Sequence, residues 1–231
     1  MEKKYTVTLD AGHGGHDPGA VNRKHNLEEA DMALDVVLRA GRMLADYVNV
    51  VYTRTDDTFI TLSQRPAISN RANADVFVSY HFNSASSPNT DSSWEIYTTP
   101  GQNRSDRLAD CIGKHHAAFF PDQAGRSDMR DGDIDKEANF AVIRRTDHPS
   151  VLMEGEFIHT DHGAALIAKP VNRQLMAQAV VLGVLDYLGI DRDSGKQGAL
   201  EYWHGFEVEE SLTIEERLSR IEQLCHITQR G

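Results

Sequence analysis

The apolar residues of this chain follow two different spacings over its first 190 positions. Short runs rich in Val, Ile, Tyr and Phe predict β-strands, and they cover residues 5–10, 50–53, 75–81, 94–98, 141–144 and 150–154. Apolar residues at intervals of three and four predict helices, and they cover residues 27–48, 64–73, 105–119 and 172–188. Because strands and helices alternate, the sequence predicts an α/β fold, a twisted and mostly parallel sheet flanked by helices on both faces.

The chain is expected to divide into three parts. Residues 1–190 form the main domain, and the polar segment 121–139 within it is predicted to be a long surface loop. Residues 191–210 are rich in glycine and acidic side chains, as in a linker. Residues 211–231 predict a short C-terminal helix whose apolar stripe must pack on the main domain or on a second copy. The nearly heptad spacing of that stripe favours self-association, so we expect a possible homo-oligomer.

Composition narrows the class of protein. The 231 residues are 40% hydrophobic and carry a net charge of −11, which is typical of a globular chain and argues against nucleic acid as a partner. We expect no membrane segment, because no apolar run approaches the ~20 residues that a spanning helix needs. The N-terminus shows no secretory signal, so we expect a protein that is cytoplasmic in the producing cell. Two distant cysteines cannot build a disulfide framework, whereas eleven histidines exceed ordinary structural needs.

Candidate metal ligands lie where an open α/β sheet places its functional edge. His13 stands in a glycine-rich turn after the first strand, Glu28 and Glu29 begin a helix, and His81 ends another strand. Two neutral imidazoles and one carboxylate, with a coordination position left open, are typical of a catalytic zinc site. Glu154 closes an apolar strand and could act as a general base. Strand alternation would place Glu156 on the same face, which makes it a rival for that role.

Several ordered motifs then resemble one known family. They are the stretch DAGHGGHDPGA at residues 10–20, Glu29 with a leucine five positions later, TRTDD at 53–57, LSQR at 62–65, NRANAD at 70–75, FVSYHFN at 77–83 and PSVLME at 149–154. Together they resemble the zinc-dependent N-acetylmuramoyl-L-alanine amidases of the Amidase_3 family. The resemblance implies a catalytic domain over residues 1–190, Zn²⁺ held by His13, Glu29 and His81, and Glu154 as the catalytic carboxylate. It also implies bacterial peptidoglycan as the substrate, cleaved between the lactyl group of N-acetylmuramic acid and L-alanine of the stem peptide.

Some alternatives stay open. The family spacing fits Glu29 better than Glu28, and Glu156 and His159 depart from the family pattern. Arg65 matches an arginine of the family. A purely structural role for it would be a salt bridge that holds the helix before the His81 strand in place. A zinc hydrolase of another peptide amide remains an alternative function, as does an inactive wall-binding module, although retention of all four site residues argues against the latter. Since no secretory signal is seen, we expect a phage or prophage endolysin that reaches the wall after release.

Overall fold

A computed structural model describes residues 3–85, 93–128 and 132–192 of the chain. Its main sheet has the strand order β4-β1-β5-β9-β6-β7, with β8 also paired to β6. The strands are β1 (Thr6–Ala11), β4 (Asn49–Tyr52), β5 (Val76–Asn83), β6 (Ser93–Thr98), β7 (Ala124–Gly125), β8 (Lys136–Glu137) and β9 (Ser150–Phe157). Neighbouring strands are parallel except that β6 runs antiparallel to β9. The predicted fold class is therefore confirmed. The predicted linker beyond residue 192 and the predicted tail lie outside the described residues.

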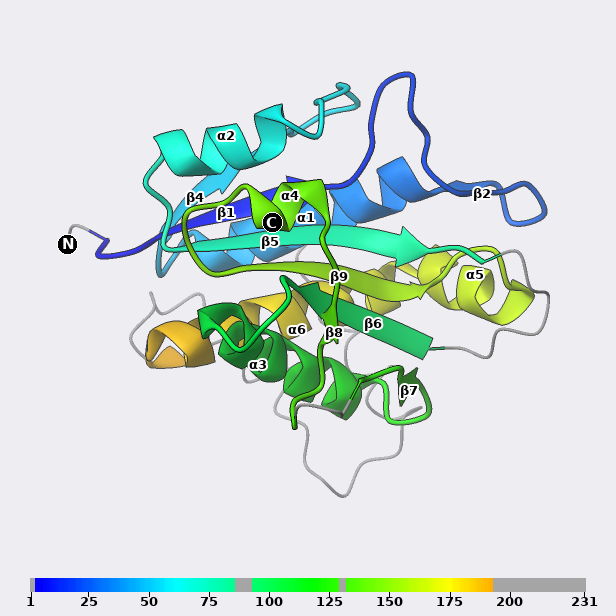
Figure 1. The fold of residues 1–231 in the computed structure, drawn as a ribbon. Helices are drawn as coiled ribbons and strands as arrows, with labels where there is room; N and C mark the ends of the chain where they lie inside the picture. The colour runs from blue at the N-terminus through cyan, green and yellow to red at the C-terminus, as the bar shows by residue number, and fades with distance from the viewer. Residues whose placement is uncertain (1–2, 86–92, 129–131, 193–231) are drawn as a thin grey trace, which may run out of the picture.

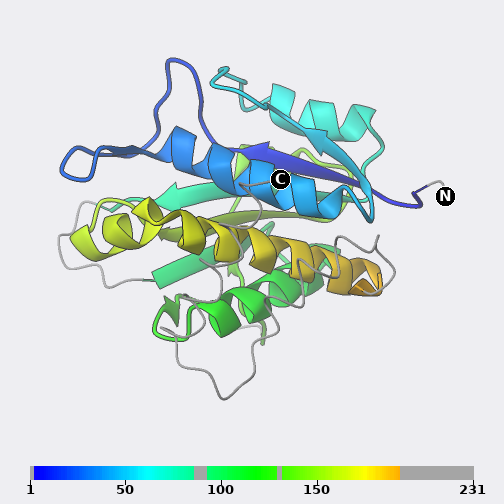
Figure 2. The same cartoon turned by 180° about the vertical axis from the view of Figure 1, so that it is seen from behind.

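Helices cover the sheet on both faces (Figures 1 and 2). The long helices α1 (Glu29–Leu44), α3 (Arg104–Phe119) and α6 (Pro170–Leu188) pack side by side on one face, over the larger part of the core. The short helices α2 (Gln64–Arg71) and α4 (Ala141–Arg144) lie on the other face, and α5 (Asp161–Ala168) follows β9. Among the described residues, no helix combines the length and apolar character needed to cross a bilayer.

Local structure differs from the sequence prediction in four places. Residues 141–144 were expected to form a strand, but they form helix α4. Val142 and Ile143 are buried there against Phe77 and Leu152. Over only four residues, a strand and a helical turn can bury such apolar side chains equally well. Helix α6 is buried around most of its surface because it packs between α1 and α3 on the face of the sheet, so it lacks the expected amphipathic pattern. The predicted loop 121–139 contains the short strands β7 and β8, and α5 was not predicted.

The parallel strands bring their carboxyl ends to one edge of the sheet. In the β5–β9 pair, His81 lies directly beside Glu154, and the register shifts by one residue immediately afterwards. Strand β1 ends at the same edge and continues into the glycine-rich turn that carries His13. A hairpin of β2 (Val21–Asn22) and β3 (Leu27–Glu28) then leads into the first residue of α1. The topology therefore gathers the predicted site residues at one place.

A buried carboxyl group near β8 predicts a pH-dependent stability. Asp135 is 2% exposed, and burial together with the nearby carboxylate of Asp133 raises the pKa of Asp135 to about 7, although Thr98 donates a hydrogen bond to it. A raised folded-state pKa stabilises the protein at low pH, and this contribution is lost as the pH rises through about 7. We expect Asp135→Asn to raise the unfolding free energy by about 1 kcal/mol or more at pH 8 and much less at pH 5. Chemical denaturation at both pH values measures this, and an equal gain at both would contradict the titration.

Candidate metal centre

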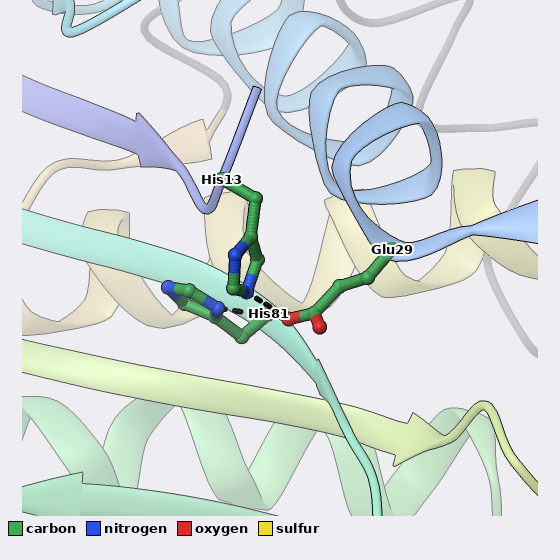
Figure 3. Close-up of side chains that lie close together, drawn as sticks. All are labelled: His13, Glu29 and His81. Atoms are coloured by element: carbon green, nitrogen blue, oxygen red, sulfur yellow. Dashed lines mark hydrogen bonds and ion pairs between the residues drawn. The ribbon is translucent and has the colours of Figure 1, made fainter. Parts of the chain in front are cut away.

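Three side chains from three different elements converge at the edge of the sheet (Figure 3). His13 comes from the turn after β1, Glu29 is the first residue of α1, and His81 lies near the end of β5. His13 Nε2 is 3.1 Å from Glu29 Oε1, and His81 Nδ1 is 2.9 Å from the same oxygen. One ligand atom from each residue lies within 4.8 Å of the other two. The cluster predicted from the sequence therefore exists, and it could hold a metal ion.

Glu29, and not Glu28, belongs to this cluster. Glu28 is exposed on β3, whereas Glu29 is 5% exposed. Backbone N–H groups hold the Glu29 carboxylate in place: Ala20 donates to Oε2 and Phe82 donates to Oε1. Burial by itself would raise the pKa of Glu29, but hydrogen bonds from His13 and His81 outweigh it and hold that pKa far below its usual range. Glu29 is therefore ionised, as a metal ligand must be.

His13 is oriented by a second carboxylate. Its Nδ1 lies 2.9 Å from Asp17 Oδ2, so its Nε2 faces the cluster. A carboxylate on the far ring nitrogen is the usual partner of a metal-binding histidine, because it fixes the tautomer and the ring orientation. His13 itself adopts a left-handed backbone conformation with φ of 58°. Asp17 was not among the predicted site residues, although its position four residues after His13 in a glycine-rich turn could have indicated this contact.

Two glycines let the backbone approach the ligands closely. A Cβ atom at Gly12 would lie 2.2 Å from Cε1 of His81. A Cβ atom at Gly19 would lie 2.6 Å from Cδ2 of His13 and 2.7 Å from Oε2 of Glu29. Neither position can take a side chain unless the cluster moves, so both glycines are part of the site's construction.

We expect Gly19→Ala to weaken metal binding, with Gly189→Ala as its matched control. Both glycines adopt left-handed backbone, with φ of 66° and 65°. Among the described residues, leaving out its chain neighbours, none has an atom within 4 Å of a Cβ placed at Gly189. Both substitutions should cost about 1 kcal/mol of stability through backbone strain. Only Gly19→Ala should also lower zinc affinity, by about 10-fold or more, because it displaces His13 and Glu29. Competition with a chelator measures the affinity, and equal zinc affinity in the two variants would contradict the role of Gly19.

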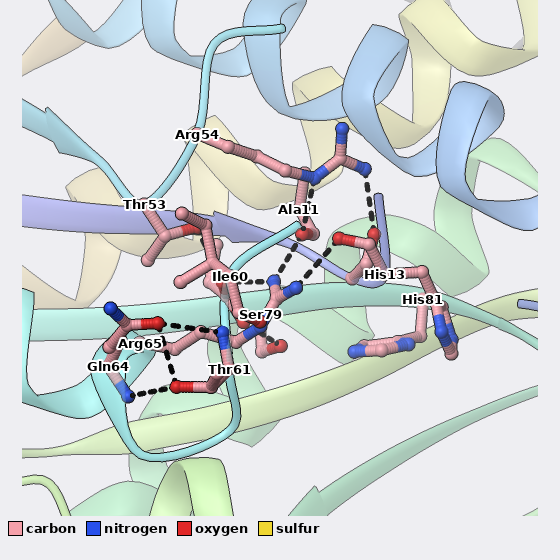
Figure 4. A network of polar contacts seen from close by, with 12 residues as sticks. Ala11, His13, Thr53, Arg54, Ile60, Thr61, Gln64, Arg65, Ser79 and His81 are labelled. Carbon is pink, nitrogen blue, oxygen red and sulfur yellow. Dashed lines mark hydrogen bonds and ion pairs between the residues drawn. The ribbon is translucent and has the colours of Figure 1, made fainter. Parts of the chain in front are cut away.

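Two buried arginines hold the turn that carries His13 (Figure 4). Arg65 pairs with Asp10 at 2.8 Å and donates to the carbonyl oxygens of Ala11 and His13. The predicted salt bridge of Arg65 is thus present, but it holds the turn as well as helix α2. Arg54 donates to the carbonyl oxygens of Ala11, Gly12 and Ala30, and so links the turn to α1. Thr53 and Ser79 satisfy the remaining positions on the Asp10 carboxylate.

Glu154 and Glu156 have different surroundings. The extra residue in β9 interrupts the two-residue alternation between them, so the predicted shared face is not kept. Glu156 is fully buried, and its carboxylate accepts hydrogen bonds from Gln123 Nε2 and from the backbone N–H groups of Ser93 and Phe157. Such a carboxylate is already engaged in holding the structure.

Glu154 lies beside the cluster residue His81 in the β5–β9 pair, and its carboxylate is not engaged in this way. Its Oε2 is buried and has no hydrogen-bond partner among the described residues. Burial, with the nearby carboxylates of Glu29 and Glu95, raises the pKa of Glu154 well above its ordinary value. An unpaired carboxylate with high proton affinity beside a candidate metal site has the properties of a general base.

One further acidic residue at the site was not predicted. Glu95 on β6 lies directly opposite Glu154 in the antiparallel β6–β9 pair and is 4% exposed. Its carboxylate accepts hydrogen bonds from Asn83, Tyr97 and Lys136. The sequence placed Glu95 in a strand but gave no indication that this strand would pair with β9.

Fold and site together define a class of protein: an α/β domain with a candidate metal centre of two histidines and one glutamate at the carboxyl edge of its parallel strands, next to an unpaired glutamate. Comparison with known families identifies the member of that class. The sequence profile of Amidase_3, N-acetylmuramoyl-L-alanine amidase, matches residues 7–186. The chain belongs to this family.

Individual relatives agree with this assignment. The chain is 34% identical over 184 residues to N-acetylmuramoyl-L-alanine amidase LytC of Bacillus subtilis. The matched region covers 79% of this chain but only 35% of LytC. The chain is 30% identical over 195 residues to the endolysin of Bacillus phage SPP1, covering 82% of this chain and 68% of the endolysin. The crystal structure of N-acetylmuramoyl-L-alanine amidase from Clostridium difficile 630 superposes with a TM-score of 0.75 at 31% identity, covering 81% of this chain and 98% of the other.

Proposed function

We propose that this chain is a zinc-dependent peptidoglycan hydrolase that cleaves the amide between the lactyl group of N-acetylmuramic acid and L-alanine. The observation that carries the proposal is the convergence of His13, Glu29 and His81 beside the unpaired carboxylate of Glu154. Membership in the amidase family supports the choice of bond. Because the chain spans only 35% of LytC and 53% of the amidase AmiC of Neisseria meningitidis, its own activity is a proposal.

The donor set fits zinc. Two imidazoles and one carboxylate are the ligands of a common type of catalytic zinc site, and the fourth position is left for water or substrate. The ligand atoms lie close enough for one ion to reach all three after small side-chain movements. Asp17 on His13 and two backbone N–H groups on Glu29 supply the supporting contacts that such sites usually have. When bound, zinc would polarise the scissile carbonyl and lower the pKa of water.

Glu154 carries the proton in the proposed reaction. Its carboxylate accepts a proton from the attacking water, whose oxygen bonds to the lactyl carbonyl carbon. Glu154 then gives that proton to the amide nitrogen as the carbon–nitrogen bond breaks, so that L-alanine leaves as an amine. The raised pKa of Glu154 suits both steps, because it strengthens the base and keeps the proton available for the leaving group.

Digestion of purified sacculi tests this function. The expected products, analysed by mass spectrometry, are glycan strands with free lactyl groups and stem peptides with a free L-alanine N-terminus. Cleavage at a different amide would favour a zinc hydrolase of another peptide bond. Binding without cleavage by zinc-loaded protein would favour the wall-binding module.

We also propose a role in lysis from inside the producing cell, with the enzyme acting on the wall after release. Similarity to the SPP1 endolysin supports this role. Expression in a host with and without a membrane-permeabilising holin tests it. Lysis should require the holin, and lysis without it would contradict the proposal.

The tail carries a separate prediction. Residues 211–231 predict a helix of about four turns whose stripe of Leu and Ile is too short to be stable alone in water. We expect the full chain to sediment as a dimer or higher oligomer and a chain ending at Ile190 to be monomeric and still active. A monomeric full chain at micromolar concentration would contradict self-association. An inactive truncated monomer would instead show that the tail supports the catalytic domain.

A further inference from the structure

The β6 side of the site presents positive charge whose position is fixed. Lys136 donates to Glu95 at 2.8 Å, so this buried carboxylate already holds its ammonium group. Arg126, which follows β7, lies close to the same carboxylate, with Nε 3.6 Å from Glu95 Oε1. Glu95 is in turn the direct cross-strand neighbour of Glu154. Both cations therefore lie at the carboxylate of the residue that pairs with the proposed general base across the strands.

Three contacts hold Arg126 while its terminal nitrogens stay available. Its backbone N–H donates to the carbonyl oxygen of Trp94 at 2.9 Å. Its guanidinium carbon lies 5.2 Å from the centroid of the Phe157 ring, and its Nε faces Glu95. The side chain is nevertheless 46% exposed, and neither Nη has an acceptor among the described residues. A guanidinium placed in this way presents a rigid fork that suits a carboxylate, at a low cost in side-chain entropy.

The charge of the site makes such a group useful to an acidic substrate. Glu29, Glu95 and Glu154 are all carboxylates near the reacting position, and the whole chain carries a charge of −11. A cation at the rim of this acidic surface would favour the approach of an anionic peptide. In a muramoyl peptide the lactyl carboxyl is consumed in the scissile amide, and the neighbouring sugars carry hydroxyl and acetamido groups. Free carboxylates therefore lie on the peptide side of the bond.

We infer that Arg126 is a specificity-determining residue that binds a free carboxylate on the peptide side of the scissile amide. The inference rests on the proposed function, and it fixes the direction in which the substrate binds. The stem peptide lies toward β6 and β7. Arg126 does not touch the reacting atoms, so its contribution appears in substrate binding more than in the chemical step.

Two synthetic muramoyl dipeptides test this inference with zinc-loaded full-length protein. They are identical except that the second residue carries a free α-carboxylate in one and a carboxamide in the other. The wild-type protein should prefer the carboxylate in kcat/KM by about 10-fold, as expected for a charge-assisted hydrogen-bonded pair. Arg126→Gln should abolish the preference through a higher KM for the carboxylate substrate alone, and Arg126→Lys should keep part of it. Arg71→Gln, an exposed arginine at the end of α2, is the matched control and should keep the preference.

The outcomes separate this inference from the proposed function. If the wild-type protein cleaves neither dipeptide nor sacculi at the lactyl–alanine bond, the proposed function is wrong. If it cleaves both dipeptides equally well, or if Arg126→Gln slows both to the same extent, carboxylate recognition by Arg126 is wrong although the enzyme is an amidase. Thermal unfolding of each variant shows that a loss of preference does not arise from a loss of folded protein.

Discussion

Replacing His81 by alanine is expected to remove nearly all bound zinc and to lower amidase activity by at least ~100-fold. His81 supplies one of three ligands, and even the loss of a supporting contact around such a site costs about 10- to 100-fold in affinity or activity. The Glu29 carboxylate would also lose one of the two imidazoles that hold its pKa low. The zinc content of the purified protein, measured by elemental analysis, should fall from about one zinc per chain to less than ~0.1.

His115→Ala is the control for this experiment. His115 lies on α3, pairs with Asp186 at 2.7 Å, and is not one of the clustered ligand residues. This variant should keep its zinc and its activity. Full zinc occupancy in His81→Ala would remove His81 from the ligand set, and with it the proposed metal centre.

Substituting Glu154 by glutamine should separate the chemistry from metal binding. Glutamine has nearly the same shape as glutamate but cannot accept the proton of water, so kcat should fall by at least ~100-fold, the usual scale for loss of a general base. Zinc content should stay at the wild-type level, because Glu154 is not one of the three clustered ligand residues. Parallel measurements of kcat and of zinc per chain distinguish this variant from His81→Ala.

Glu156→Gln is the matched comparison. Glu156 accepts hydrogen bonds from Gln123 and from two backbone N–H groups, so an amide nitrogen in its place would face donors. The expected result is a lower melting temperature, by several degrees, with kcat within about 10-fold of wild type. If Glu156→Gln were the inactive variant and Glu154→Gln retained turnover, the assignment of the base would be reversed.

The spacing of apolar residues along the chain was enough to predict most of the fold. Alternating strands and helices with long apolar runs allow few arrangements other than a covered parallel sheet, and the structure has that arrangement. The pattern was insufficient at residues 141–144, because four apolar-rich residues satisfy burial equally well as a strand or as one turn of helix. The antiparallel direction of β6 was also not predictable, since strand pairing depends on contacts between distant segments.

The sequence by itself determined which residues are candidates for the site. His13 follows β1, His81 and Glu154 lie in the carboxyl-terminal halves of β5 and β9, and Glu29 begins a helix. In a parallel sheet these positions come together at one edge. Only the tertiary structure decided which of the paired acidic residues belong to it. Glu28 faces solvent while Glu29 is buried, and a single extra residue in β9 separates the surroundings of Glu154 from those of Glu156. The physical reason is that burial, hydrogen-bond partners and pKa depend on neighbours that are distant in sequence, such as Gln123 for Glu156 and Glu95 for Glu154.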